Sequence, residues 1–239
     1  MSRGATLRRR LVALALLALA LLAGYFFWLR DSSLVQVREV EVRGATVERK
    51  EVTAAIRRAA LKMTTLHVDD AALLRAVSDQ PTVASIKAQS SIPHGLTVTI
   101  TERPPVAVAD LQVGGASAAS PTAISADGFA LAGVPLRGLR LPSLEAGMAG
   151  PVRLDPEGRA QAAVLGATPG PLVSGLRSAR WDSDQGGVVV DLAGAPELRF
   201  GDGSAPRVKW AAAAALLADP GRPSATFIDV SVPGRPAIG

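Results

Sequence analysis

Residues 96–102, LTVTITE, alternate between apolar and polar positions. Leu96, Val98 and Ile100 would share one face of an extended chain and the threonines the other, which is the period-two pattern of a half-buried β-strand. Two prolines follow at positions 104 and 105, and proline cannot donate a hydrogen bond to a strand ladder. The pattern therefore predicts a strand that ends near residue 102 and continues into a stiff, extended exit.

The residues before this strand predict a small α/β block over about 34–104. An extended stretch with valine at positions 35, 37, 40 and 42 stops at Gly44. Residues 48–61 carry apolar side chains at i, i+3, i+4, i+7 and i+8, the spacing of an amphipathic helix. A second helix is expected after Asp69, a suitable N-cap. Strands over 83–89 and 96–102, joined by a turn containing proline and glycine, complete the order β-α-α-β-β.

Residues 105–239 predict a second block of mainly short, mostly antiparallel strands with two helices. An Asp-Gly pair at 127–128 lies between two apolar runs and indicates a hairpin. One helix is expected to start at Asp155-Pro156 and end near Gly166, and the other to run from Pro206 to just before Pro220. Further strands are expected over 176–181, 188–192, 198–200 and 226–232. The fold class predicted for the two blocks is α+β.

Before the first block, residues 11–29 contain no charged side chain. A helix of this length would be about 28 Å long, close to the hydrocarbon thickness of a bilayer. Arginines at positions 3, 8, 9 and 10 precede it, and the positive-inside rule keeps such a tail in the cytoplasm. We therefore expect a cytoplasmic tail (1–10), a transmembrane helix (11–29) and an extracytoplasmic remainder. A cleaved signal peptide with a small-x-small site at 18–20 is the alternative.

Composition excludes several classes of function. The net charge is +5, but without the four N-terminal arginines the chain has 22 basic and 21 acidic residues. No basic run interleaved with aromatic residues remains, so we expect no nucleic-acid binding. The chain has no cysteine, which excludes disulfides, thiolate catalysis and cysteine-bound metal.

The remaining side chains suggest no active site. His67 and His94 are the only histidines and have no metal-ligand spacing. The segment DSDQGG, residues 182–187, resembles the start of a calcium loop but has alanine at the position that requires glutamate, so a hairpin turn is expected. Spacing alone leaves a pair of carboxylates for glycan cleavage open. We expect no catalysis, no metal, no cofactor and no small-molecule substrate.

Several motifs resemble the FtsQ/DivIB family of cell-division proteins. They are VREVEVRGA, LHVDDAALLRAV, QPTVASI and SIPHGLTVTITERPPVA, together with the apolar segment upstream and the Ile-Asp-Val ending. The most specific is the stretch from Pro93 to Pro105. The resemblance implies a POTRA domain over 34–104 whose last strand passes through the proline exit into a β domain over 105–239. It also implies a single-pass inner-membrane protein at the division septum.

In that family, the protein is a scaffold rather than an enzyme. The resemblance implies that it links early cytoplasmic division proteins to septal peptidoglycan synthesis by binding FtsB/DivIC-like and FtsL-like partners outside the membrane. Two alternatives stay open. The chain could be a membrane-anchored cell-wall enzyme, or an export chaperone, that carries a POTRA-like module.

The final predicted strand, TFIDVSV, is the expected partner site. Pro233, Gly234 and Pro236 follow it, so we expect that the chain does not fold back to cover it and that its backbone N–H and C=O groups are open to a partner strand. An edge blunted by proline and charge is the alternative. The resemblance also implies that a terminal strand receives FtsB. The predicted partner-binding residues are Phe227, Ile228, Asp229, Val230, Ser231 and Val232.

Overall fold

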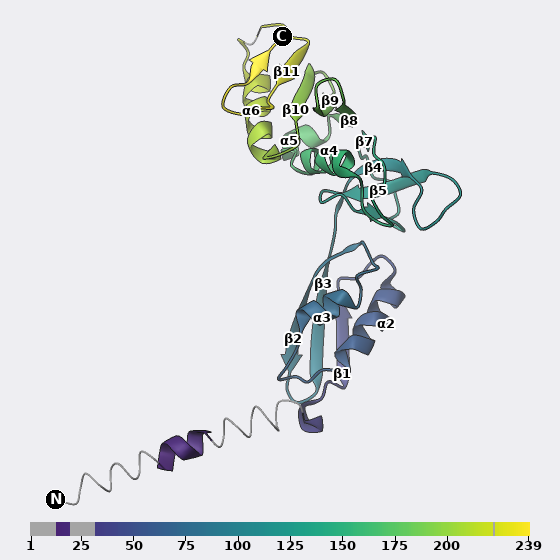
Figure 1. The fold of residues 1–239 in the computed structure, drawn as a ribbon, viewed down its shortest axis with the longest axis vertical. Helices are drawn as coiled ribbons and strands as arrows, with labels where there is room; N and C mark the ends of the chain where they lie inside the picture. The colour runs from purple at the N-terminus through teal and green to yellow at the C-terminus, as the bar shows by residue number, and fades with distance from the viewer. Residues whose placement is uncertain (1–12, 20–31, 222) are drawn as a thin grey trace, which may run out of the picture. The chain divides into compact units, whose positions relative to one another are not determined.

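The structure is a computed structural model that describes residues 13–19, 32–221 and 223–239 (Figure 1). Contacts between residues divide the chain into two units, Met1–Glu102 and Arg103–Gly239. The division lies two residues before Pro104, the last residue that the sequence assigned to the first block. Both units combine helices with a β-sheet, so the chain is α+β.

The structure does not support the transmembrane helix that was part of the predicted fold class. Of residues 11–29, only 13–19 are described, and they are helical and exposed; the rest of the predicted span lies outside the described residues. Seven helical residues extend over about 10 Å, a third of the roughly 30 Å hydrocarbon core of a bilayer. No helix in the described ranges is long and apolar enough to cross a membrane, so this part of the prediction is wrong for them.

In the first unit, residues 32–102 form one sheet covered by helices (Figure 1). The middle strand, β3, pairs with β1 in parallel and with β2 in antiparallel orientation, giving the order β1-β3-β2. The predicted β-α-α-β-β order is confirmed. The elements are η2 (Ser33–Val35), β1 (Glu39–Arg43), α2 (Arg49–Ala60), α3 (Asp70–Arg75), β2 (Val83–Ser91) and β3 (Gly95–Glu102).

Local sequence explains why these elements begin and end where they do. Asp69 caps α3, because its carboxylate accepts a hydrogen bond from the backbone N–H of Ala72 at 3.0 Å. Gly44 ends β1 with a φ of +88°, a left-handed conformation that favours glycine. On β3, Leu96, Val98 and Ile100 are buried, while Thr99 and Thr101 are exposed, so the predicted phase of the alternation is confirmed.

The core of the first unit lies between the sheet and α2. One stripe of α2, at spacing i, i+4 and i+8, is buried and consists of Val52, Ile56 and Ala60. Leu73 of α3 is also fully buried, whereas Val42 of β1 is only partly buried at the margin of the core. Burial of these side chains is the main stabilising contribution to so small a unit.

The second unit contains a nine-stranded mixed sheet with the order β12-β11-β10-β9-β8-β7-β4-β5-β6. Most neighbouring strands are antiparallel, but β10/β11, β4/β7 and β7/β8 are parallel. The strands are β4 (Pro105–Leu111), β5 (Ser120–Ser125), β6 (Ala130–Leu131), β7 (Ser143–Leu144), β8 (Leu176–Asp182), β9 (Gly187–Leu192), β10 (Glu197–Gly201), β11 (Phe227–Asp229) and β12 (Ala237–Ile238). The helices are α4 (Pro156–Gly166), α5 (Gly170–Val173) and α6 (Pro206–Ala218).

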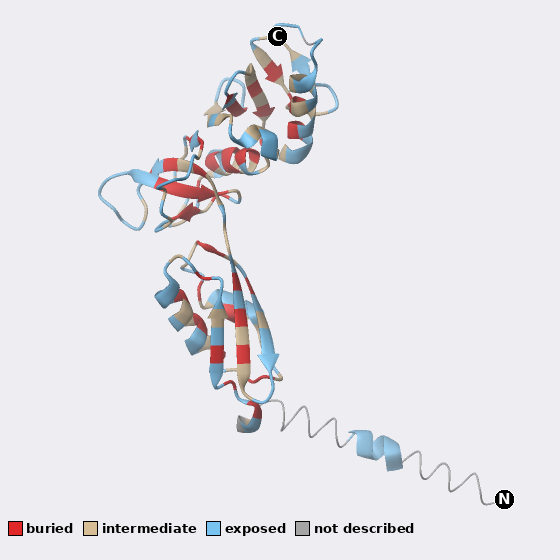
Figure 2. Cartoon of the chain, turned by 180° about the vertical axis from the view of Figure 1, so that it is seen from behind, coloured by how far each residue is buried: buried red, intermediate tan, exposed pale blue. Residues whose placement is uncertain are grey.

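Helices α4 and α6 pack on this sheet, and their buried faces are coloured red in Figure 2. Asp155 caps α4 by accepting a hydrogen bond from the N–H of Gly158 at 2.7 Å, with Pro156 at the first helical position as predicted. The two helices are joined where the indole N–H of Trp210 donates to the carbonyl of Val164 at 2.7 Å. This contact fixes α6 beside the C-terminal strands.

One charged side chain of α6 is buried. The ammonium group of Lys209 donates to the carbonyl of Phe200 at 2.8 Å and to the carboxylate of Asp202 at 2.9 Å, and the lysine side chain is only 3% exposed. Hydrogen bonds from Ser204 and from Lys209 hold the pKa of Asp202 far below its usual value. The lysine thus connects α6 to the end of β10, next to the strand predicted to bind a partner.

Candidate partner-binding edge

The predicted partner strand lies inside the sheet, not at its edge. Of residues 226–232, Phe227–Asp229 form the strand β11. This strand pairs with β10 on one side and with β12 on the other. The expectation that the chain does not fold back is therefore wrong. The reversal uses the proline- and glycine-containing segment that was expected to prevent it, since Arg235 N–H donates to the Val232 carbonyl at 2.9 Å across that turn.

The six predicted residues differ in their accessibility. Ile228 and Val230 are fully buried in the core of the second unit. Val232 lies in the turn and is 57% exposed. The others, Phe227, Asp229 and Ser231, are partly buried. The structure therefore places three of the six on an accessible face and one in an exposed turn.

The hydrogen bonds of β11 show which backbone groups face which neighbour. Val230 N–H donates to the Arg199 carbonyl at 2.9 Å, so even-numbered residues direct their backbone groups toward β10. Phe227 exchanges hydrogen bonds with Gly239, donating at 3.0 Å and accepting at 3.2 Å, so odd-numbered residues face β12 and the residue that follows it. Alternate residues of a strand face opposite neighbours, as these bonds require.

The open edge of the sheet is thus β12. Phe227 and Gly239 form a hydrogen-bonded pair, so the next pair, Ile228 and Ile238, is of the non-hydrogen-bonded type. The N–H and C=O of Ile238 therefore point away from β11. These are the strand groups that the C-terminal edge of the sheet offers to a partner.

Phe227 is held from both sides on the face of the sheet away from the helices. The guanidinium carbon of Arg199 lies 3.8 Å from the centre of its ring, a cation–π contact. Gly239 packs against the same ring, since a Cβ at Gly239 would lie 2.5 Å from the ring Cζ. The ring therefore connects the edge to the charged side chains of β10.

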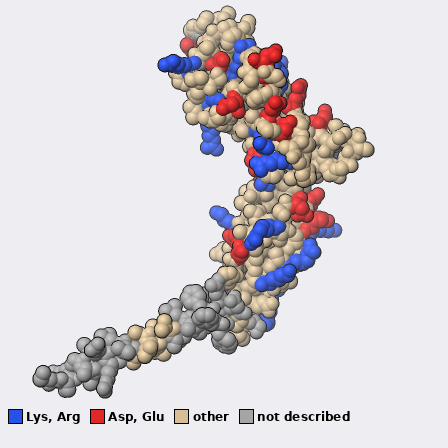
Figure 3. Space-filling model, in the orientation of Figure 1, with Lys and Arg blue, Asp and Glu red and all other residues tan. Residues whose placement is uncertain are grey.

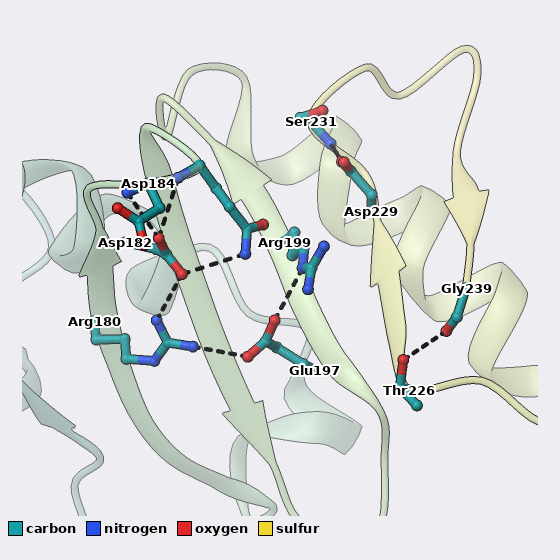
Figure 4. Close-up of polar contacts among 10 residues, drawn as sticks. Arg180, Asp182, Asp184, Glu197, Arg199, Thr226, Asp229, Ser231 and Gly239 are labelled. Atoms are coloured by element: carbon teal, nitrogen blue, oxygen red, sulfur yellow. Dashed lines mark hydrogen bonds and ion pairs between the residues drawn. The ribbon is translucent and has the colours of Figure 1, made fainter.

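Those charges form a ladder across β8 and β10, shown in Figure 4. Arg180 donates to Asp182 at 3.0 Å and to Glu197 at 2.7 Å, and Arg199 donates to Glu197 at 2.9 Å. The hydrogen bond from Arg180 is the main reason why the pKa of Asp182 is lowered. We call Asp182, Arg180, Glu197 and Arg199 the charge ladder.

The residues of the charge ladder are not among those predicted from the sequence. Its local signal is a pair of opposite charges at i and i+2 on each strand, Arg180/Asp182 and Glu197/Arg199. Arg180 of β8 and Arg199 of β10 both lie opposite Val189 of β9. This register is what brings Arg180 next to Glu197. A hollow of about 210 Å³ lies beside it and is lined in part by Ser178 and Asp191.

The calcium-like segment at residues 182–187 forms a turn between β8 and β9. Asp182, which begins the calcium-like segment, accepts hydrogen bonds from the N–H groups of Asp184 and Gln185 at 3.0 and 3.1 Å, as in an ordinary hairpin turn (Figure 4). Within 13–19, 32–221 and 223–239, no group of three or more histidine or acidic side chains could hold a metal ion. The arrangement suits binding through an edge and a polar face. No protein-family model matches this chain, and no curated protein matches it.

Proposed function

We propose that the protein is a non-enzymatic scaffold of the FtsQ/DivIB type that acts at the division septum. Its second unit would hold FtsB/DivIC-like and FtsL-like partners outside the cytoplasm. The observation that carries the proposal is the pair of units itself. A β-α-α-β-β unit ends in the Glu102-Arg103-Pro104-Pro105 exit and is followed by a mixed sheet with an open C-terminal edge.

Binding would occur by addition of a partner strand to β12. A strand beside β12 would pair with the outward N–H and C=O of Ile238, and main-chain hydrogen bonds of this kind supply affinity with little sequence preference. Side chains of the partner would supply specificity where they reach Val232 in the turn and Phe227 beside Arg199. The charge ladder favours a partner with side chains of both signs, because its own charges are already paired internally.

The test is a titration of the full chain with an FtsB/DivIC-like protein from the same genome. Ile238→Pro removes the outward N–H, and we expect it to weaken binding at least about tenfold. Ile238→Ala is the matched control, because it shortens the half-buried side chain and keeps the N–H. Unchanged affinity of a folded Ile238→Pro variant would overturn strand addition at this edge.

Two further substitutions separate binding from folding. Val230→Pro should damage the sheet itself, because Val230 N–H bonds the Arg199 carbonyl. Val232→Asp should weaken binding and leave the fold intact, because the side chain is 57% exposed. A fluorescent fusion that stays evenly distributed during constriction, or activity of the pure protein on cell wall, would contradict the proposed function.

A further inference from the structure

The first unit has a groove along the outer edge of β1. It has a volume of about 610 Å³ and lies between β1 and α2, which are neighbours at one side of the sheet in Figure 1. Its floor includes Val40, Val42 and Leu96. The proposed partner site lies in the other unit, so this groove has no part in it.

The backbone of β1 is open toward the groove. The N–H groups of Arg38 and Glu39 both donate to the His94 carbonyl, at 2.9 and 3.2 Å, and β1 itself starts at Glu39, which lies opposite Gly95. In a parallel ladder a residue that bonds the residue before its opposite number faces that neighbour, so the odd-numbered residues of β1 face β3. The even-numbered Val40 and Val42 therefore direct their N–H and C=O groups outward. The guanidinium of Arg57 bonds the outward carbonyl of Val40 at 3.3 Å. The two N–H groups and the carbonyl of Val42 remain available along this edge.

The opposite edge of the same sheet is protected. There α3 packs against β2, and the carboxylate of Asp70 accepts the N–H of Ala88 at 3.1 Å. A side chain that satisfies a strand N–H is one way in which proteins blunt an edge. Arg57 bonds one outward carbonyl of β1, but the outward N–H groups of Val40 and Val42 stay open, so β1 is the edge of this sheet that can accept another strand.

The two walls of the groove have opposite charge. On α2, Arg49, Thr53 and Arg57 follow each other at i, i+4 and i+8 and form the helical wall. Glu39 and Glu41 of β1 line the other side, and Glu41 is also paired with Arg43 at 2.9 Å. Figure 3 shows Lys and Arg side chains gathered on the α2 side of this unit. Within the described residues, neither arginine of the wall forms an ion pair with a carboxylate.

These features define the chemistry of the occupant. A strand added to β1 would direct alternate side chains toward α2 and toward the face that carries Glu39 and Glu41. Acidic side chains of the added strand would suit the side that faces the arginines of α2. Basic side chains would suit the side that faces Glu39 and Glu41. We propose that the β1 groove binds an extended segment of a partner protein in which acidic and basic residues alternate.

The probe is a synthetic peptide of about seven residues that alternates glutamate and lysine, long enough to span the five residues of β1. Its control has the same composition with all glutamates before all lysines. The full chain, labelled with nitrogen-15, is titrated with each peptide, and the amide resonances of Val40 and Val42 are followed by NMR. We expect the alternating peptide to shift both resonances and to bind at least about tenfold more tightly than the control peptide.

Charge reversal on α2 tests the helical wall. Arg49→Glu should weaken the alternating peptide about tenfold, whereas Lys50→Glu should not change it, because Lys50 is exposed but does not line the groove. Val42→Pro removes an outward N–H and should abolish the shifts, with Val42→Ala as its control. The proposal is overturned if neither resonance shifts, if both peptides bind equally, or if Arg49→Glu and Lys50→Glu have the same effect.

Discussion

Glu102, the last residue of β3, should make the stability of the first unit depend on pH. One oxygen of its carboxylate accepts hydrogen bonds from the N–H of Thr46 at 2.7 Å and of Val47 at 3.1 Å, and the other accepts the Thr46 hydroxyl. Both residues lie in the connection between β1 and α2. Partial burial acts to raise the pKa of Glu102, but these hydrogen bonds outweigh it, and the pKa is lower than usual.

The magnitude follows from the bonds that Glu102→Gln would lose. The amide keeps one acceptor oxygen and puts an NH₂ group where the second oxygen stood. Hydrogen bonds to a charged group contribute about 1.5–3 kcal/mol each, and since water reaches this half-buried site we expect a net loss of about 1–2 kcal/mol. Because the pKa is lower in the folded unit, the stabilisation is complete above the unfolded pKa of about 4.3 and is lost as the pH falls through the folded value.

The assay must report on the first unit alone. Trp181 and Trp210 belong to the second unit and Trp28 lies outside the described residues, so tryptophan fluorescence does not serve. Urea titrations followed through the NMR signals of β3 at pH 7 and pH 4 measure the correct unit. Glu102→Gln should shift the midpoint down at pH 7 and less at pH 4. Glu41→Gln, which removes an exposed ion pair with Arg43, is the control and should leave the midpoint unchanged. Equal effects of the two variants, or an effect of Glu102→Gln that does not depend on pH, would refute the reasoning.

Three further substitutions test the packing. Ile100→Ala should lower the unfolding free energy of the first unit by about 2–5 kcal/mol in urea titrations, because Ile100 is buried. Thr99→Ala should be nearly neutral, because Thr99 is exposed. Equal losses would mean that the strand faces the other way. Gly44→Ala should lower the same midpoint, since a Cβ at this left-handed position would meet the Ile100 carbonyl, and an unchanged midpoint would contradict that turn geometry. Trp210→Phe removes the indole N–H from the Val164 carbonyl, which keeps the N–H of Ala167 at 3.2 Å, and should cost the second unit about 0.5–1.5 kcal/mol, measured by calorimetry; no loss would mean that the indole bond is not formed.

Local signals allowed much of the fold to be predicted. The alternation in β3, the N-caps at Asp69 and Asp155 and the hairpin at Asp127-Gly128 each depend on residues close together in the chain, and each is present. A period alone does not say which face is buried. In β4 the larger side chains, Val106 and Val108, are partly exposed, while Ala107 and Ala109, which alternate with them, are buried. That choice depends on the helix that packs against the strand.

Features that depend on register between distant strands could not be predicted. The pairing of β12 with β11 does not follow from the local pattern, because proline and glycine at 233 and 234 indicate the end of a strand and equally suit a reversal of the chain. The bond between Arg180 and Glu197 spans 17 residues of sequence and an intervening strand. Lys209 gave no signal of burial, because a lysine at the start of a helix is ordinarily exposed.

Each of the two sheets has one protected and one open edge within the described residues. In the first unit Asp70 covers β2 and β1 is open; in the second, the segment around Val152 accepts the N–H of Ala130 and covers β6, while β12 is open. A protein that had only to remain monomeric would be expected to blunt both edges of each sheet, since an open edge invites aggregation. Two open edges in two separate units therefore favour two separate docking sites. They differ in chemistry, because β1 lies between walls of opposite charge whereas β12 adjoins an aromatic ring and charges that are already paired. It follows that Ile238→Pro should weaken binding of the FtsB/DivIC-like partner and leave the affinity for the alternating peptide unchanged, and Arg49→Glu should do the reverse. A variant at one edge that impaired both ligands would show that the sites are not independent.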